Sequence, residues 1–178
     1  DGASLQQLRA RGGAITVVSS PADCIALARS HPDREVVFLG IGFETTSPAV
    51  AATLCACRQQ GIGNLSVLSV HKLIPPALQA LLSDPEVSID GFLCPGHVST
   101  IIGARAYGCV TSAGKAAVIA GFEPVDILES IYMLLGQILH SACEVAIQYV
   151  RAVKPEGNRR AIAVLERVFR PVPAAWRG

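Results

Sequence analysis

The 178-residue sequence has few charged residues and lacks any long apolar run. Charged residues make up 16% of it, and the net charge at pH 7 is only +1. Because the basic residues are scattered, the sequence gives no sign of the basic surface that binds nucleic acid. No apolar stretch reaches the roughly 18 residues that a membrane-spanning helix requires, so we expect no membrane span.

The sequence also lacks an initiator methionine and a targeting signal. Its first residues, DGASLQQLRARGG, contain no basic segment followed by an apolar one, so we do not expect a signal peptide. We expect a cytoplasmic protein. The missing methionine favours a piece excised from a longer chain.

C-x-x-C pairs, the usual signature of metal or redox sites, are absent. Cys55 and Cys57 lie two residues apart in an expected helix, where they point to different faces. We interpret the cysteines as small buried apolar residues in a reducing cytosol, with Cys94 set apart because it ends an expected strand. The six are Cys24, Cys55, Cys57, Cys94, Cys109 and Cys143. We expect neither metal ligands nor a cofactor in this chain.

The sequence is rich in short apolar runs, and 51% of its residues are hydrophobic. Each run is apolar on both faces, as buried parallel strands are, and a helix-start signal follows it. The expected strands are 14–20, 35–42, 64–70, 89–94 and 116–122, and the expected helices are 21–30, 48–60, 75–83, 98–104 and 124–141. Five successive units predict an α/β protein, with a parallel sheet of about five strands and helices on both faces.

The pattern changes after residue 141. Residues 144–153 favour a helix, with or without an irregular end, and KPEGN favours a turn. Residues 159–169 have the apolar spacing of an amphipathic helix. We therefore expect an α/β domain over residues 1–141 and a C-terminal helical extension over 142–178.

Polar residues gather after four of the expected strands, in the motifs GFETT, HKLIPP, PGHVST and GFEP. Ligands of open parallel sheets bind beyond the carboxyl ends of the strands, so we expect these residues to share one edge. The candidate cleft residues are Glu44, Thr45, Thr46, His71, Lys72, His97, Ser99 and Glu123. We assign none of them a catalytic role. Ser99 or Thr100 should cap the short helix that follows the fourth strand, with His97 outside the core.

Each motif also has a simpler structural explanation. GIGFETT is rich in glycine but matches neither of the common phosphate-binding patterns. Glu44 can complement the dipole of the following helix, Glu123 can be an N-cap, and Lys72 can be solvated. A single histidine such as His97 is often only a structural hydrogen-bonder. The shared location of four polar clusters nevertheless favours one site.

Five stretches resemble the motifs of the HypD family of [NiFe]-hydrogenase maturation factors, in the family's order: GFETTSPA, SVHKLIPPAL, GFLCPGHVSTIIG, AGFEPVDIL and PEGN. The resemblance runs from ARGGAITVVSSPADCIALA to the closing WRG. It implies a cytosolic scaffold that, with the small chaperone HypC, holds the iron on which the Fe(CN)2CO group is assembled. HypE would supply the cyanide ligands. The full-length family also carries a [4Fe–4S] cluster and has two α/β domains that face each other across a cleft.

The sequence departs from this family in its cysteines, because it has neither the C-G-x-H-type motif nor G-P-G-C-P-V-C. We therefore interpret the chain as a central fragment, mainly the second α/β domain, which leads toward a missing cluster-binding part. The resemblance places Glu44, Thr45, Thr46, His97 and Ser99 in the cleft. Hydrogen bonding to cyanide nitrogens, or orientation of a thiolate or proton donor, would suit these side chains.

Two other classes of function remain open at this point. One is a stand-alone α/β domain that binds a nucleotide or small metabolite at the same edge. The other is an interaction scaffold that docks a partner and does no chemistry. On the family interpretation the protein is an accessory maturation factor, and this fragment alone is expected to be inactive.

Overall fold

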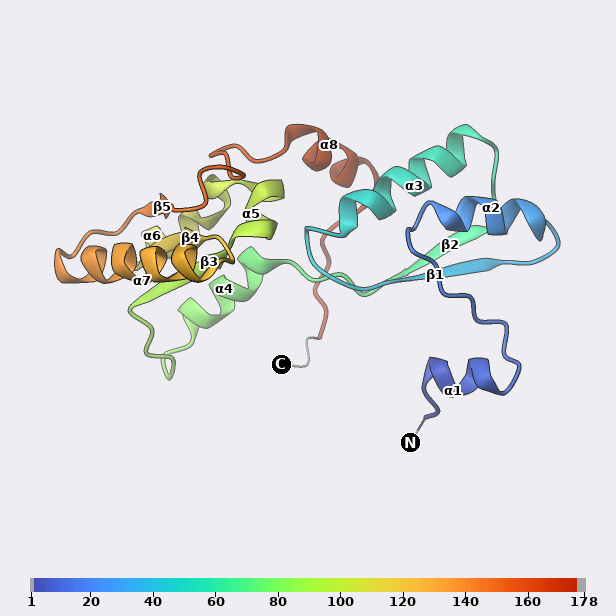
Figure 1. Ribbon diagram of the computed structural model, residues 1–178, viewed down its shortest axis with the longest axis horizontal. Coiled ribbons are helices and arrows are strands. Elements are labelled where there is room, and N and C mark those ends of the chain that lie inside the picture. Colours follow the sequence, from blue (N-terminus) through green and yellow to red (C-terminus); the bar gives the residue numbers. More distant parts are fainter. Residues whose placement is uncertain (1, 176–178) are drawn as a thin grey trace.

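The computed structural model describes residues 2–175 and consists of two lobes, each with its own parallel sheet (Figure 1). The first sheet pairs β1 (Val36–Gly40) with β2 (Leu65–Ser69). The second has the order β3-β4-β5, from Gly91–Pro95, Ala116–Ala120 and Val145–Ile147. The α/β class and the parallel pairing are confirmed. The strands, however, are divided between two sheets, where the sequence suggested one sheet of about five.

The helices match the expected ones closely where a proline or a clear apolar period marked them. Pro48 and Pro124 both lie in the first turn of a helix, where a missing N–H costs nothing. The helices are α1 (Leu5–Ala10), α2 (Asp23–Ser30), α3 (Ser47–Gln59), α4 (Ile74–Ser83), α5 (Gly96–Ile102), the 3₁₀ helix η1 (Ala104–Tyr107), α6 (Gly108–Ser112), α7 (Pro124–Leu139) and α8 (Arg159–Val168). The sequence interpretation had missed α1, η1 and α6.

Two expected elements were wrong. Residues 14–20 form no strand, and Val17 in their middle is 73% exposed. β-Branched residues favour a strand only where a neighbouring strand and a core receive them. Residues 144–153, expected as a helix, instead contain β5, which pairs with Ala117–Ile119 of β4. A strand of three residues is too short to show a period.

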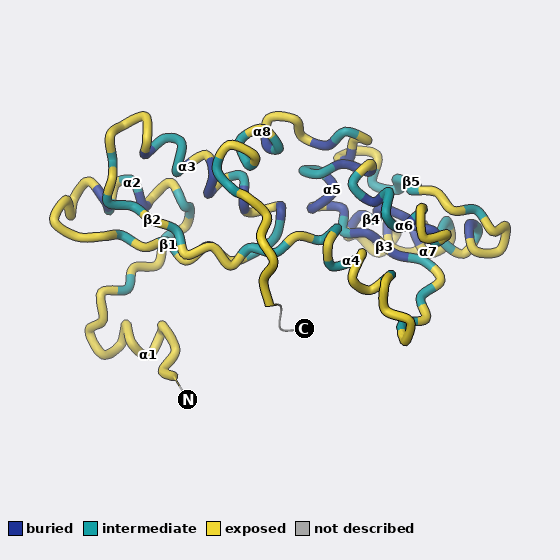
Figure 2. Tube along the Cα trace, turned by 180° about the vertical axis from the view of Figure 1, so that it is seen from behind, coloured by how far each residue is buried: buried dark blue, intermediate teal, exposed yellow. Residues whose placement is uncertain are grey.

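The second lobe contains the main hydrophobic core, as the concentration of buried residues in Figure 2 shows. Val118 and Ile119 of β4 are fully buried. They are buried because β4 is the central strand, with α7 in front of the sheet and α6 behind it (Figure 1). Tyr107 and Val110, from η1 and α6, are fully buried as well. By contrast, α1 has no buried residue.

The chain returns to the first lobe at its C-terminal end. Asn158 caps α8 by accepting hydrogen bonds from the backbone N–H groups of Arg160 and Ala161, both at 3.1 Å. From there α8 packs along α3 (Figure 1). The first lobe therefore comprises β1, β2, α2, α3 and α8, and the second comprises β3 to β5 with α4 to α7. The division at residue 141 stays a prediction.

No helix within residues 2–175 is both long enough and apolar enough to span a membrane.

Candidate functional site

The carboxyl ends of the two sheets point toward each other across the middle of the molecule (Figure 1). The GFETT loop follows β1 and the HKL segment follows β2, while PGHVST follows β3 and GFEP follows β4. All eight candidate residues therefore lie at carboxyl ends, as expected. They do not share one edge of one sheet, because the strands belong to two sheets.

Glu44 joins the two lobes. Its side chain is 2% exposed, and its Oε1 accepts a 2.9 Å hydrogen bond from the backbone N–H of Ile74, the first residue of α4. Its other oxygen, Oε2, is buried and has no hydrogen-bond partner among the described residues. Burial raises the pKa of the Glu44 carboxyl, although the N–H groups of Glu44 and Ile74 oppose this. When it is protonated, this carboxyl can donate a hydrogen bond from Oε2.

Tyr107 anchors the PGHVST loop from within the second lobe, and sequence reasoning missed it. Its hydroxyl lies 2.8 Å from the Oγ of Ser99, which is 2.8 Å from the carbonyl oxygen of Pro95. Both Ser99 and Tyr107 are fully buried. Burial raises the pKa of the Tyr107 phenol, although its hydrogen bond with Ser99 opposes this.

The expected helix-capping role of Ser99 and Thr100 was wrong. Both hydroxyls donate to carbonyl oxygens: Ser99 to Pro95, and Thr100 to His97 at 2.7 Å. Residue 95 occupies the N-cap position of α5, and no side chain caps that helix. A hydroxyl one turn inside a short helix reaches the carbonyl of the preceding turn more easily than a free N–H at the helix start.

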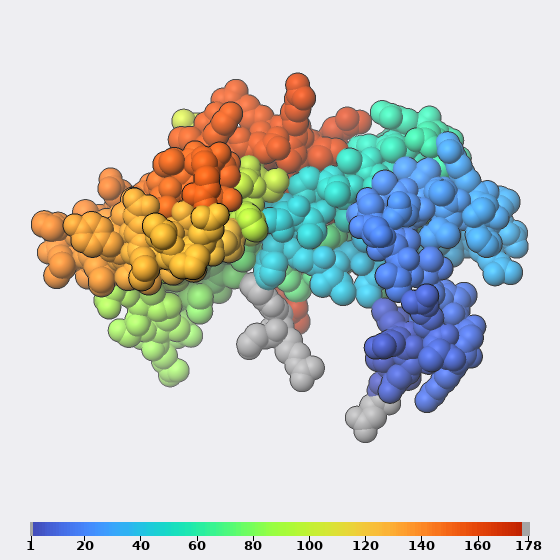
Figure 3. Space-filling view, viewed as in Figure 1, coloured from blue at the N-terminus to red at the C-terminus, as the bar shows by residue number. Residues whose placement is uncertain are grey.

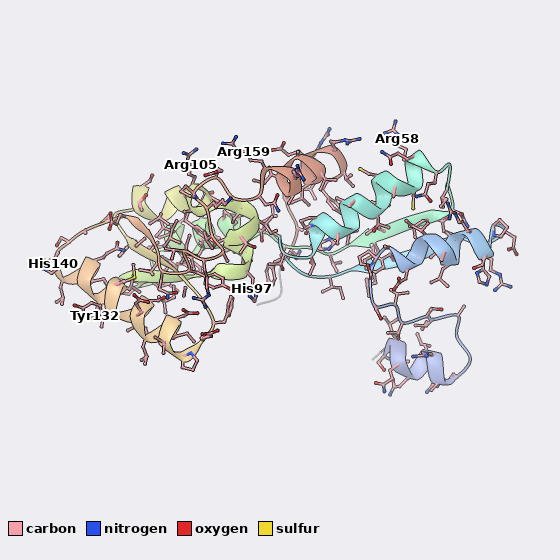
Figure 4. The ribbon with its side chains drawn as sticks, turned by 45° about the horizontal axis from the view of Figure 1, so that its top comes forward. Arg58, His97, Arg105, Tyr132, His140 and Arg159 are labelled. Carbon is pink, nitrogen blue, oxygen red and sulfur yellow. The ribbon has the colours of Figure 1, made fainter. Side chains whose placement is uncertain are left out.

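His97 is exposed at the carboxyl end of β3, as expected (Figure 4). It belongs to an aromatic cluster with Phe122 and Tyr149. Its ring centroid lies 3.9 Å from that of Phe122, with the rings inclined by 31°. Tyr149 lies 6.4 Å from His97 and stands edge-on to Phe122 at 6.3 Å. These residues follow β3, β4 and β5. They present an imidazole beside two aromatic rings at the edge of the second sheet.

Glu123 is an N-cap residue, as its simpler explanation suggested. It forms a reciprocal capping box with Asp126 at the start of α7, and it lies 3.9 Å from Arg151. The buried Asp126 receives hydrogen bonds from both Nη atoms of Arg151 and from Gln148. These bonds hold the pKa of the Asp126 carboxyl well below its usual range. Asp126, which the sequence did not single out, thus clamps α7 to the segment after β5.

His71 and Lys72 lie beside the C-terminal segment of the chain. The Nδ1 of His71 is 2.9 Å from the Oγ of Ser69, and the His71 ring stands edge-on to Phe169 at 5.6 Å. Its Nε2 is buried without a hydrogen-bond partner in the described chain, and burial lowers the pKa of the imidazole. The Nζ of Lys72 donates to the carbonyl oxygen of Ala175. Both side chains therefore have structural contacts.

Thr45 and Thr46 are exposed at the start of α3. The Oγ1 of Thr46 donates to the carbonyl oxygen of Phe43 at 3.1 Å, which stabilises the turn of the GFETT loop. Thr45 is exposed, so an external group can approach it.

Among residues 2–175, no three His, Cys, Asp or Glu side chains lie close enough to hold a metal ion. Burial raises the pKa of the Cys94 thiol to about 12, which disfavours the thiolate that ligates iron. The donor groups of this part of the chain therefore do not fit the [4Fe–4S] cluster that the family resemblance implies.

A surface cavity of about 400 Å³ lies between α3 and α8. Its lining residues are Leu54, Cys55, Arg58, Gln59, Arg167 and Val168. None of the eight candidate residues is among them. The candidate site is thus distinct from this cavity.

Comparison with known proteins identifies the family. The HypD family model, described as "Hydrogenase formation hypA family", matches residues 1–178. The hydrogenase maturation factor HypD of Rhodobacter capsulatus is 44% identical over 177 residues, covering 98% of this chain and 47% of that protein. The HypD of Cupriavidus necator is 44% identical over 185 residues, covering 99% and 49%. That of Escherichia coli is 41% identical over 167 residues, covering 93% and 45%.

The chain spans about half the length of these curated relatives, and the matched half contains both lobes. The family match covers the motifs that lie at the facing carboxyl ends of the two sheets. The chain therefore belongs to the HypD family of hydrogenase maturation factors.

Proposed function

We propose that this chain forms part of a scaffold on which the Fe(CN)2CO group of [NiFe]-hydrogenase is assembled, with the iron group as cargo. The observation that carries this proposal is the position of the GFETT and PGHVST loops at the facing ends of two sheets (Figure 1). Glu44 of the GFETT loop also binds the second lobe, through its hydrogen bond from the N–H of Ile74 at the start of α4. A group held between the loops would be contacted from both lobes.

The side chains at this junction suit a cargo that carries cyanide ligands. A cyanide nitrogen accepts hydrogen bonds, so the protein must offer donors. The exposed imidazole of His97 and the hydroxyl of Thr45 are donors at the surface. Glu44 is buried, and its bond to Ile74 makes it a positioning group between the lobes.

The remaining parts of the proposal come from the family. We assign to this protein a HypC-type chaperone and a HypE-type cyanide donor as partners, and the cytoplasm as its location. The [4Fe–4S] cluster of the family would be held by residues outside this chain, because the cysteines present do not suit it. The chain is then an accessory maturation factor that is inactive by itself.

To test the proposal, this chain replaces the matching residues of the Rhodobacter capsulatus relative, and the chimera is expressed in a strain that lacks its own copy of that relative. Hydrogenase activity should be restored, and it should be lost again when His97→Ala is introduced. Thr111→Ala, a change in α6 away from the strand ends, is the matched control and should retain activity.

Two results would contradict the proposal. The first is full hydrogenase activity in a His97→Ala, Glu44→Gln double variant, which would leave only partner docking as the role of the chain. The second is a specific thermal shift of the isolated chain with ATP that His97→Ala abolishes. That result would favour the nucleotide-binding alternative.

A further inference from the structure

Tyr149 lies where two loops of the candidate site approach each other. It follows β5 by two residues, and its half-buried ring packs against the main hydrophobic core of the second lobe. The same ring is near His97, from the loop after β3, and Phe122, from the loop after β4. In Figure 3 the start of α7 and the segment after β5 adjoin α5 at the surface of this lobe. The core therefore supports a ring that reaches both loops.

Each of the two loops has a glycine where it passes the ring of Tyr149. A Cβ atom at Gly96 would lie 2.7 Å from the Cδ1 of Tyr149, and a Cβ atom at Gly121 would lie 2.9 Å from its Cδ2. The carbonyl oxygen of Ala120 and the carboxylate of Asp126 crowd the same two positions. Because packed atoms do not approach so closely, neither position accepts a side chain while the ring is in place. The ring therefore sets the spacing between the two loops.

The residues on either side of Tyr149 hold its ring in this position. The guanidinium of Arg151 lies over the ring, 4.5 Å from its centroid, and is itself fixed by hydrogen bonds from both Nη atoms to Asp126. Gln148 accepts a 3.1 Å hydrogen bond from the backbone N–H of Gly121 and donates one of 2.9 Å to Asp126. The segment after β5 is thus bound to the GFEP loop and to the start of α7.

The ring of Tyr149 also limits the orientation of His97. The imidazole of His97 stacks on Phe122 at 3.9 Å, and Phe122 meets Tyr149 edge-on at 6.3 Å, with an angle of 87° between the two rings. His97 is exposed and Phe122 is 52% exposed, so this pair has little core packing of its own to hold it. An edge-to-face contact with a supported ring supplies that restraint. The three rings therefore form a chain of contacts from the core to the imidazole.

We propose that Tyr149 is a positioning residue of the candidate site. Its ring holds the PGHVST and GFEP loops at a fixed separation and thereby sets the direction in which the imidazole of His97 is presented. The inference rests on the proposed function, in which His97 donates a hydrogen bond to the cargo. Tyr149 acts on the cargo only through His97.

Histidine-selective NMR of the natural chain and its variants measures the position of His97. Because its imidazole lies over the ring of Phe122, the ring current should shift its proton signals upfield, and the signal is assigned as the one that His97→Ala removes. Tyr149→Leu should lose most of this upfield shift. The signal of His140, at the other end of α7, should stay unchanged (Figure 4). Tyr149→Phe, which keeps the ring, is the matched control and should leave both signals in place.

Hydrogenase activity of the chimera with the Rhodobacter capsulatus relative is the second measurement. Tyr149→Leu should lose this activity, and Tyr149→Phe should keep it. Thermal melts of each variant distinguish a displaced loop from an unfolded lobe. If Tyr149→Leu does not fold, Tyr149→Met takes its place, because an unbranched side chain adapts to an irregular gap without supplying a flat ring.

The two measurements distinguish this inference from the proposed function. An unchanged His97 signal in a folded Tyr149→Leu or Tyr149→Met variant would overturn the inference and leave the proposed function intact. A change in Tyr149→Phe as large as that in Tyr149→Leu would assign the effect to the hydroxyl and contradict the role of the ring. A displaced His97 signal with full hydrogenase activity would have the opposite meaning: Tyr149 positions His97, but maturation does not need His97, and the proposed function fails.

Discussion

The hydroxyl groups of Ser99 and Tyr107 lie 2.8 Å apart at a position where neither side chain is exposed. This contact ties the first turn of α5 to η1. It also sets the position of the PGHVST loop, since Ser99 donates in turn to the carbonyl of Pro95. The loop that presents His97 is thus held from behind by a fully buried hydrogen-bond network.

Tyr107→Phe should lower the free energy of unfolding by about 1 kcal/mol, because one buried hydrogen bond is lost while Ser99 keeps its bond to Pro95. The urea midpoint should fall with an unchanged slope. Tyr132→Phe is the control and should have almost no effect, since Tyr132 is 79% exposed. An unchanged midpoint for Tyr107→Phe would mean that the hydroxyl pair contributes nothing to stability.

Glu44→Gln should flatten the pH dependence of stability above pH 4.5, the ordinary pKa of a glutamate. Burial raises the pKa of Glu44 in the folded state, so the folded chain binds this proton more tightly than the unfolded one. Its contribution is therefore present in acid and is lost as the pH rises through the raised pKa. The neutral amide keeps an acceptor for the N–H of Ile74, so stability at pH 7 should not fall.

Denaturant unfolding between pH 4 and pH 8 measures this effect, with the exposed Glu86→Gln as control. Burial lowers the pKa of His71, so its contribution runs the other way and is lost as the pH falls below 6.5. Both variants retain His71. The difference between them therefore isolates Glu44, and parallel pH profiles would contradict the prediction.

His97→Ala should cost only about 0.5–1 kcal/mol of stability, the value of one exposed aromatic contact with Phe122. When it is introduced into the chimera with the Rhodobacter capsulatus relative, the same change should nevertheless abolish hydrogenase maturation. The melting temperature and the hydrogenase activity together decide the outcome. A large drop in melting temperature would show that His97 is mainly structural, and normal activity would remove it from the site.

Asp126→Asn should destabilise the chain at neutral pH, because the guanidinium of Arg151 loses its paired carboxylate. The pKa of Asp126 is depressed, so its contribution is present above pH 3.8 and is lost as the pH falls below that value. The difference between the variant and the natural chain should therefore shrink in acid. Glu123→Gln, next to the same arginine but exposed, should have a much smaller effect.

The sequence predicted the local elements well, because their signals are local. Pro48 and Pro124 mark helix starts by removing an N–H that has no partner there. Which strands pair is a different question, since it depends on contacts between distant residues. The apolar runs that became β1 and β3 look alike in sequence, yet they belong to different sheets.

The candidate site was predicted only in part, because the sequence shows local signals but not contacts between distant residues. Glu44 and His97 stood out because a charged or titratable group is unusual after an apolar strand. Tyr107 and Asp126 gave no comparable signal: Tyr107 lies in a small-residue stretch, and Asp126 looks like an ordinary first-turn acid. Their importance comes from burial, and burial is set by the assembled fold.

The packing of α8 on α3 has a consequence for synthesis on the ribosome. Helix α3 is complete at Gln59, and α8, which covers it, begins about a hundred residues later at Arg159. Until α8 emerges, the face of α3 that it covers is open to water and to other chains. The first lobe, although nearer the N-terminus, must therefore finish folding last, after the second lobe has closed around β4.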